Sequence, residues 1–279
     1  MKTDTRMACV FALVMASNSL ATGCGSDDGA VQPSPDWVLT MADEFDGPVD
    51  TPPDPTFWRY DIGGDGWGNG QLEFDTNRIE NVSLDGEGRL RIIAREESFM
   101  GNDYTSGRIK TQGLVEQKYG RFEARIKLPL GQGIWPAFWM LGANFEEVGW
   151  PECGEIDVME FRGQQPQVIY GSVHGPGYSG VDAIGSTFRL LNGKTFADDF
   201  HVFAVDWDPG QLRYWVDDAL YQTIPTSRVS ASGNWVFNQP FFLLLNVAVG
   251  GGFVGPVGPN TEFPATMLVD YVRVYERAR

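Results

Sequence analysis

Polar and apolar residues alternate along several short segments of this chain with a period of two. The clearest case is the segment 121–128, where polar residues occupy the odd positions and apolar residues the even ones. Successive side chains of a β-strand point to opposite faces, so the pattern predicts strands with one buried face. No long stretch has the period of a helix, and 34 glycines and 17 prolines suit tight turns. We therefore expect an all-β fold, an antiparallel sandwich or jelly roll. Further strands are expected at 90–94, 134–141, 167–173, 200–207, 212–216, 241–249 and 267–275.

One predicted strand, 154–161, carries three carboxylates. Glu155 and Asp157 are two positions apart and share a face. Glu160 lies at an odd offset from Glu155, so a regular strand would turn it to the other face. One extra residue in a β-bulge, most simply at Met159, restores the parity. We therefore expect all three acids on one face, with the apolar residues between them in the core.

Crowded carboxylates raise one another's pKa and tend to share protons. Glycoside hydrolysis uses such a pair, with one carboxylate ionised and one protonated near neutral pH. With the bulge, Glu155 and Glu160 are separated by about 13 Å along the backbone. Their side chains can lean together to about 5–6 Å, which is nearer the separation of retaining than of inverting enzymes. The alternative is a solvated acidic strand face.

Tryptophans are dense beside the acidic strand. Trp135, Trp139 and Trp150 all lie within twenty residues before Glu155. Indole rings stack on the apolar faces of sugars, while their N–H groups bond hydroxyls. Strand alternation places Trp135 and Trp139 on one face. Core packing is the alternative for any single tryptophan, but the density beside three acids favours a sugar site.

The acidic composition limits the partners of the chain. Its 279 residues include 37 acidic and 21 basic ones, a formal net charge of -16. This balance argues against nucleic acid or an anionic membrane as the main partner. The hydrophobic fraction of 42% supports a large core. No second linker or internal repeat is visible, so we expect one domain at 37–279, acting as a monomer.

The N-terminal segment 1–23 resembles an export signal. It has a basic start followed by an apolar run, 7–16, that is too short to span a bilayer. Small residues before Cys24 resemble a bacterial lipoprotein cleavage site, with ordinary signal cleavage as the alternative. Residues 24–36 then form a flexible tether. We expect an exported protein, either extracellular or a cell-surface lipoprotein that meets the membrane only through a lipid on Cys24.

Five separated motifs resemble glycoside hydrolase family 16, and within it the bacterial endo-1,3-β-glucanases known as laminarinases. The resemblance as a whole covers about residues 37–276 in unbroken order. The motifs are YGRFEAR at 119–125, GIWPAFWML at 133–141, GEIDVME at 154–160, GSVHGPGYSG at 171–180 and LVDYVRVY at 268–275.

The resemblance implies a concanavalin A-like β-jelly-roll with a concave sugar-binding cleft. It also implies endo-acting, retaining hydrolysis of β-1,3 bonds in β-glucans such as laminarin. By motif position, Glu155 would be the nucleophile and Glu160 the acid/base. Asp157 would lie between them and tune the nucleophile. No cofactor would be required for catalysis.

The same resemblance suggests which residues would line the cleft, and one position departs from the family. Where relatives often have a tryptophan after a run of glycines, this chain has Phe253, which keeps an aromatic platform without the indole N–H. His174 lies in a loop-like Gly- and Pro-rich setting, although a buried structural histidine is the alternative. The candidate substrate-binding residues are Trp135, Trp139, Trp150, His174, Asn69, Arg108, Asn246 and Phe253.

A structural Ca²⁺ is also implied, away from the catalytic centre. Glu44 and Asp270 match the family's positions, and oxygen ligands suit this ion. A plain surface pair is the alternative reading.

Two other functions remain open. A non-catalytic β-glucan-binding protein could use the same scaffold, but it would have no need of Glu155, Asp157 and Glu160 together. A relative acting on mixed-linkage glucan, agar or carrageenan is the second alternative. The sugar-facing motifs show no cluster of lysines and arginines, which disfavours sulfated substrates.

Overall fold

The computed structural model describes residues 36–231 and 233–278. The predicted signal 1–23 and the lipidation site Cys24 lie outside the described residues, as does all of the tether except Asp36. The described residues belong to one unit, Pro33–Arg279.

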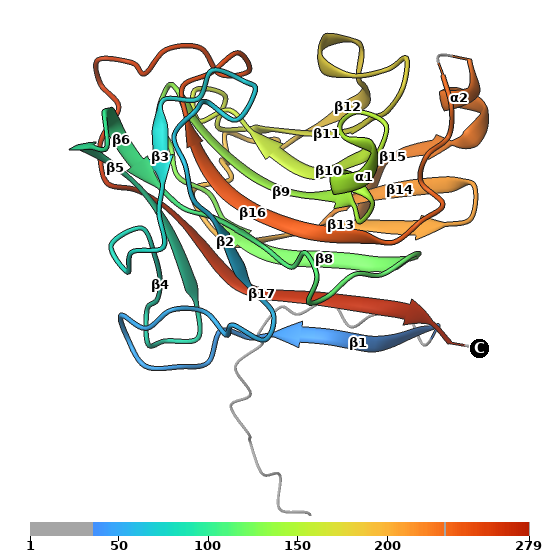
Figure 1. Ribbon diagram of the computed structural model, residues 1–279, viewed down its shortest axis with the longest axis horizontal. Helices are drawn as coiled ribbons and strands as arrows, with labels where there is room; N and C mark the ends of the chain where they lie inside the picture. Colours follow the sequence, from blue (N-terminus) through green and yellow to red (C-terminus); the bar gives the residue numbers. More distant parts are fainter. Residues whose placement is uncertain (1–35, 232, 279) are drawn as a thin grey trace, which may run out of the picture. The chain divides into compact units, whose positions relative to one another are not determined.

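One layer of the fold is a sheet of seven antiparallel strands. In pairing order they are β12 (Ile184–Arg189), β11 (Val168–His174), β10 (Glu155–Phe161), β9 (Ile134–Gly142), β16 (Phe241–Val249), β7 (Arg108–Lys110) and β2 (Arg59–Asp61). The acidic strand β10 therefore lies between the tryptophan-bearing β9 and the histidine-bearing β11. Figure 1 shows β9 and β16 as strongly curved neighbours.

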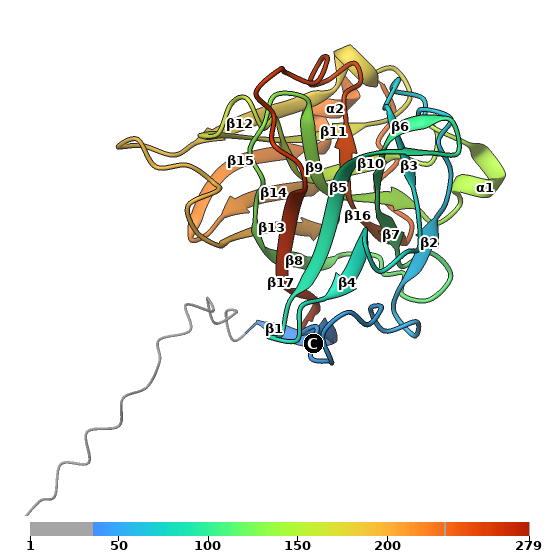
Figure 2. The ribbon, with the colours of Figure 1, turned by 90° about the vertical axis from the view of Figure 1, so that its left-hand side faces the viewer.

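The second layer is a sheet of ten strands, which packs against the first (Figure 1, Figure 2). Its main path runs through β15 (Ala219–Pro225), β14 (Gln211–Val216), β13 (His201–Asp208), β8 (Gly120–Lys127), β17 (Ala265–Arg277), β5 (Leu90–Phe99), β6 (Asn102–Ser106) and β3 (Glu73–Asp75). Two further strands, β1 (Trp37–Asp43) and β4 (Val82–Leu84), pair with β17 and β5. Among the described strands, only β3 and β6 pair in parallel.

Helical structure is limited to three short segments in the described part of the chain. They are α1 (Phe145–Val148), α2 (Thr226–Ser230) and the 3₁₀ turn η1 (Gly180–Asp182). None of these helices has the length and apolar character needed to span a bilayer. The predicted all-β sandwich is confirmed, and the nine strands expected from the sequence are present, most with bounds shifted by a few residues.

Strand β16 shows how the seven-stranded sheet divides its two faces. All nine of its residues are buried. The residues at 241, 243, 245, 247 and 249 join the main hydrophobic cluster between the sheets. On the other face, Phe242 and Leu244 pack against Cys153. Asn246 shares that face and accepts a hydrogen bond from the indole N–H of Trp139. We call this outer face the catalytic face.

A buried ion network stabilises the ten-stranded sheet. The Arg121 guanidinium bonds Glu123 at 2.8 Å and Asp206 at 2.9 Å. The remaining carboxylate oxygens accept hydrogen bonds from the Tyr275 hydroxyl and the Trp215 indole N–H. Every charge in this network therefore has a partner, as burial requires.

We predict that Arg121→Met lowers the free energy of unfolding by about 3–5 kcal/mol, because it leaves buried Glu123 without a cation and Asp206 with only the more distant Arg213, at 3.5 Å. Urea denaturation followed by tryptophan fluorescence measures this loss. The matched control is Arg125→Met on the same strand, whose partner Asp270 is 32% exposed. Its loss should be about 1 kcal/mol or less. Equal losses in the two variants would contradict the prediction.

Candidate active site

The register of β10 contains the predicted bulge. On the β9 side, Asp157 pairs with Trp139 and Met159 pairs with Phe138, so Val158 and Met159 together face one partner residue. The shift lies between Asp157 and Glu160 on the β11 side too. Both bulge residues are buried in the core. The bulge returns Glu160 to the catalytic face, which confirms the geometric prediction made from the spacing.

Glu155 accepts a short hydrogen bond from an exposed tryptophan. The Trp150 indole nitrogen lies 2.6 Å from its Oε2 atom, and Trp150 itself is 45% exposed. Burial and the negative charge of Asp157 raise the pKa of Glu155. The charge of His174 and the Trp150 N–H favour the ionised form instead. Substrate bound here would thus meet a Glu155 side chain that already accepts one hydrogen bond.

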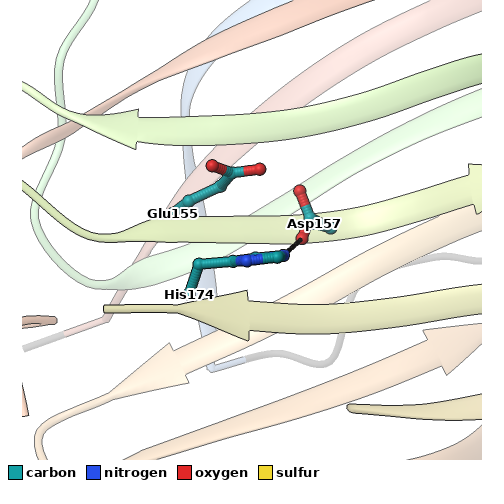
Figure 3. Close-up of side chains that lie close together, drawn as sticks. All are labelled: Glu155, Asp157 and His174. Carbon is teal, nitrogen blue, oxygen red and sulfur yellow. Dashed lines mark ion pairs between the residues drawn. The ribbon is translucent and has the colours of Figure 1, made fainter. Parts of the chain in front are cut away.

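Asp157 is the most enclosed of the three acids, at 2% exposure. Its Oδ2 atom accepts hydrogen bonds from the Ser172 hydroxyl at 2.6 Å and from Nε2 of His174 at 3.0 Å. Burial works to raise its pKa, but the charge and hydrogen bond of His174 outweigh burial and lower it. Figure 3 shows Glu155 and Asp157 rising from β10, with His174 reaching Asp157 from β11. Asp157 therefore carries a fixed negative charge beside Glu155.

His174 is held by a contact on each ring nitrogen. Its Nε2 faces Asp157, and its Nδ1 accepts the backbone N–H of Gly180 at 3.0 Å. Burial opposes the charged ring, but Asp157 raises the pKa of His174 to about 9. The Gly180 amide opposes the charged ring, since a protonated Nδ1 cannot accept its N–H, but the neighbouring acids outweigh this opposition. In either form, Nε2–H donates to Asp157.

Glu160 is bonded by a different tryptophan. The Trp135 indole nitrogen lies 3.1 Å from its Oε1 atom, which leaves Oε2 free to carry a proton. Burial and the charge of Asp157 raise the pKa of Glu160, while the Trp135 N–H and the Arg162 cation oppose the rise. Glu160 is thus suited to remain protonated near neutral pH, as a general acid must.

A second group of predicted residues extends across the sheet from Trp139. Asn246 on β16 accepts the Trp139 N–H at 2.8 Å. Arg108 on β7 lies over two indoles, 4.5 Å from the Trp67 ring and 4.8 Å from the Trp139 ring. Its Nε bonds Asp61 at 3.0 Å. These side chains line the catalytic face from β9 to β7.

The last two predicted residues lie in loops. Asn69 is exposed, and its carbonyl accepts the N–H of Gly252. Phe253 follows directly and packs against Trp135, with ring centroids 5.0 Å apart. The contact places Phe253 next to the tryptophan that bonds Glu160.

Sequence reasoning missed Ser172, Tyr170 and Arg162. Ser172 and Tyr170 alternate with His174 on β11, so the rule that grouped the acids on β10 would have found them. Arg162 follows the end of β10, two positions after Glu160. It lies in none of the quoted motifs, and its neighbours come from distant parts of the chain.

The two residues expected to bind calcium do not fit a cation site. Both carboxylate oxygens of Glu44 are bonded by the Arg273 guanidinium, at 2.7 and 2.8 Å. Asp270 is bonded by Arg125 at 2.8 Å. Each acid thus already has a positive partner, which opposes a metal ion at the same oxygens. The pairs match the alternative reading, in which these are structural surface acids.

One group of three residues in the described chain has the donor types and spacing of a metal site. Ligand atoms of Glu155, Asp157 and His174 lie within 4.8 Å of one another. Their polar atoms are already bonded to one another or to Trp150, Ser172 and Gly180. We therefore read the group as an acid cluster suited to proton transfer and to chemistry at an acetal carbon, rather than as an ion cage.

Comparison with known proteins agrees with this geometry. The family model for glycosyl hydrolases family 16 matches residues 67–272. A β-glucanase from Rhodothermus marinus is 44% identical over 270 residues, which is 92% of each chain. An endo-β-1,3-glucanase from Pyrococcus furiosus superposes with a TM-score of 0.82 at 45% identity, covering 87% of this chain and 95% of that one. The laminarinase catalytic domain of Thermotoga maritima gives 0.82 at 46% identity, covering 88% and 100%. The chain belongs to glycosyl hydrolase family 16.

Proposed function

We propose that the protein is a retaining endo-1,3-β-glucanase that cleaves β-glucans such as laminarin. The observation that carries the proposal is the bulged β10, which brings Glu155 and Glu160 to one face with different partners. Glu155 is bonded by Trp150, and Glu160 by Trp135. The laminarinase-like relatives supply the substrate class.

The reaction follows in two steps. In the first, Glu155 attacks the anomeric carbon while Glu160 gives its proton to the glycosidic oxygen, so that bond breaks and a glycosyl ester forms. In the second, Glu160 takes a proton from water, the water oxygen attacks the same carbon, and Glu155 leaves as a carboxylate. Both steps move protons and electron pairs among carboxyl groups, sugar and water, so no cofactor is needed.

Asp157 would support the first step through its fixed charge and its hydrogen bonds. Ser172 and His174 hold that carboxylate in place. A negative charge beside Glu155 stabilises the positive charge that develops on the sugar ring in an oxocarbenium-like transition state.

Action on mixed-linkage β-1,3-1,4-glucan is the second candidate activity. The same acid pair would cleave either linkage, because the acids contact only the scissile bond. A purely glucan-binding role is disfavoured by the separate hydrogen-bond partners of Glu155 and Glu160, which binding alone does not require.

We predict that the enzyme degrades laminarin faster than lichenan and leaves cellulose intact. Product sizes on the three glucans, measured side by side, test the linkage, and a ladder of oligosaccharides from laminarin shows endo action. NMR of the first product should show the β-anomer, because two displacements retain configuration. An initial α-anomer would refute the two-step route.

Azide rescue distinguishes the roles of the two glutamates. We expect Glu155→Ala and Glu160→Ala each to lower laminarin hydrolysis about 10³-fold or more. With an activated aryl β-laminaribioside, azide should rescue both variants. The Glu155 variant should give the α-glycosyl azide by direct attack, and the Glu160 variant the β-azide by attack on the ester. The control Glu152→Ala removes an exposed acid nearby and should keep full activity. Exchanged products would reverse the assignment.

We also propose that the protein is exported, that Cys24 carries a lipid, and that 24–36 tethers a monomeric domain to the cell surface. The basic and apolar N-terminal sequence supports export. Radiolabelled palmitate should enter the chain expressed in a bacterium and should be absent from Cys24→Ser. Equal labelling of the wild type and Cys24→Ser would argue against acylation at this residue. Light scattering of the purified protein tests whether it is a monomer.

A further inference from the structure

Arg162 is a cation on the catalytic side of the sheet with no acidic partner among the described residues. Its guanidinium carbon lies 4.0 Å from the ring centre of Phe253 and 4.9 Å from that of Tyr170. Its Nε atom is buried and has no hydrogen-bond partner. By contrast, Arg108 on β7 is paired with Asp61. Two aromatic faces therefore fix Arg162, while its charge stays uncompensated.

The rings that hold Arg162 lead directly to Glu160. Phe253 packs against Trp135 at 5.0 Å, and Tyr170 meets the edge of Phe253 at 5.2 Å with rings at 81°. Trp135 donates its indole N–H to Glu160 at 3.1 Å. Tyr170 is also the β11 residue paired with Glu160 in the register. Each residue in this stack thus contacts the next, from the guanidinium to the carboxyl group.

We propose that Arg162 is a positioning residue for Glu160: it clamps Phe253 against Trp135, so that the indole N–H orients the acid/base carboxyl. The inference rests on the proposed function, in which Glu160 protonates the leaving group. Arg162 itself need not contact the sugar. The clamp matters because proton transfer in the first step requires Oε2 to point at the glycosidic oxygen.

The charges around Glu160 come from three strands and the segment after β10. Glu155 and Asp157 on β10 are acidic, and His174 on β11 is the nearest titratable base. Tyr221 on β15 also interacts with Glu160. Strands β9 and β16 contribute no titratable side chain. Arg162 is the cation that lowers the pKa of Glu160.

Removal of Arg162 should therefore shift the pKa of Glu160 in a defined direction. Without the cation, the pKa of Glu160 rises further, and the protonated acid persists to higher pH. The basic limb of the kcat/KM profile should then move toward higher pH. The loosened stack should also weaken acid assistance, which a sugar leaving group needs and a dinitrophenolate does not.

The experiment compares Arg162→Gln and Arg162→Lys with the wild type on laminarin and on dinitrophenyl β-laminaribioside. For Arg162→Gln, we expect kcat/KM on laminarin to fall about 10–100-fold, with the aryl substrate changed less than about twofold. The basic limb of the kcat/KM profile should move to higher pH in Arg162→Gln. In Arg162→Lys, which keeps the charge, it should lie at the wild-type pH. Arg189 lies on β12 and donates a hydrogen bond to Gln167, so Arg189→Gln is the matched control. It should leave kcat/KM and the basic limb unchanged.

Equal losses on both substrates with an unmoved basic limb would show that Arg162 only supports the fold, and would overturn the proposal. So would full laminarin activity in Arg162→Gln. If Arg162→Gln does not fold by circular dichroism, Arg162→Met, which keeps the apolar stem over Phe253, should show the same shift of the limb. If the wild type has no activity on laminarin, the proposed function itself is wrong. Failure of the Arg162 proposal and failure of the proposed function are therefore distinguishable.

Discussion

The two-residue bulge in β10 is the constraint on which the active site depends. A regular strand would place Glu155 and Glu160 on opposite faces, one of them in the hydrophobic core. Val158 and Met159 together face Phe138, and this one irregularity reverses the parity. Both bulge residues are apolar and buried, so core packing holds the irregularity in place. The catalytic geometry is thus fixed by the same contacts that stabilise the sandwich.

The three acids share one face of the sheet, but their different neighbours give them different chemistry. Asp157 is charged because β11 supplies Ser172 and His174 beneath it. That charge, together with burial, raises the pKa of Glu155 and of Glu160. Each glutamate then has its own indole donor, from the loop before β10 or from β9. One enclosed charge therefore acts on both glutamates, and each glutamate accepts a hydrogen bond from a different indole.

Alternation in the sequence predicted the sandwich, the acidic strand and its bulge, because long strands with one buried face carry a strong period-two signal. It missed β2, β3, β4 and β7, which have three residues each and leave no measurable period, and it also missed the longer β1, β6, β12 and β15. The calcium expectation depended on partners that no motif shows. The motif places Glu44 and Asp270, but only the fold shows that arginines Arg273 and Arg125 already bond them. Motifs report residue types, whereas partners from distant strands decide the charge.

On the catalytic face, the residues along β10 differ in their contacts from the residues that lie across the neighbouring strands. Along β10, the site runs from Trp150 at Glu155 to Trp135 at Glu160, so groups placed along the strand act on proton transfer. Across the strands, Trp139, Asn246 and Arg108 lie on β9, β16 and β7 in turn, and they contact neither glutamate by a hydrogen bond or ion pair. A glucan crossing the strands would therefore meet the predicted binding residues Trp139, Asn246 and Arg108, and the acids only where it crosses β10. Differences in linkage preference should then arise across the sheet, while the hydrolytic step depends on β10 and its immediate supports.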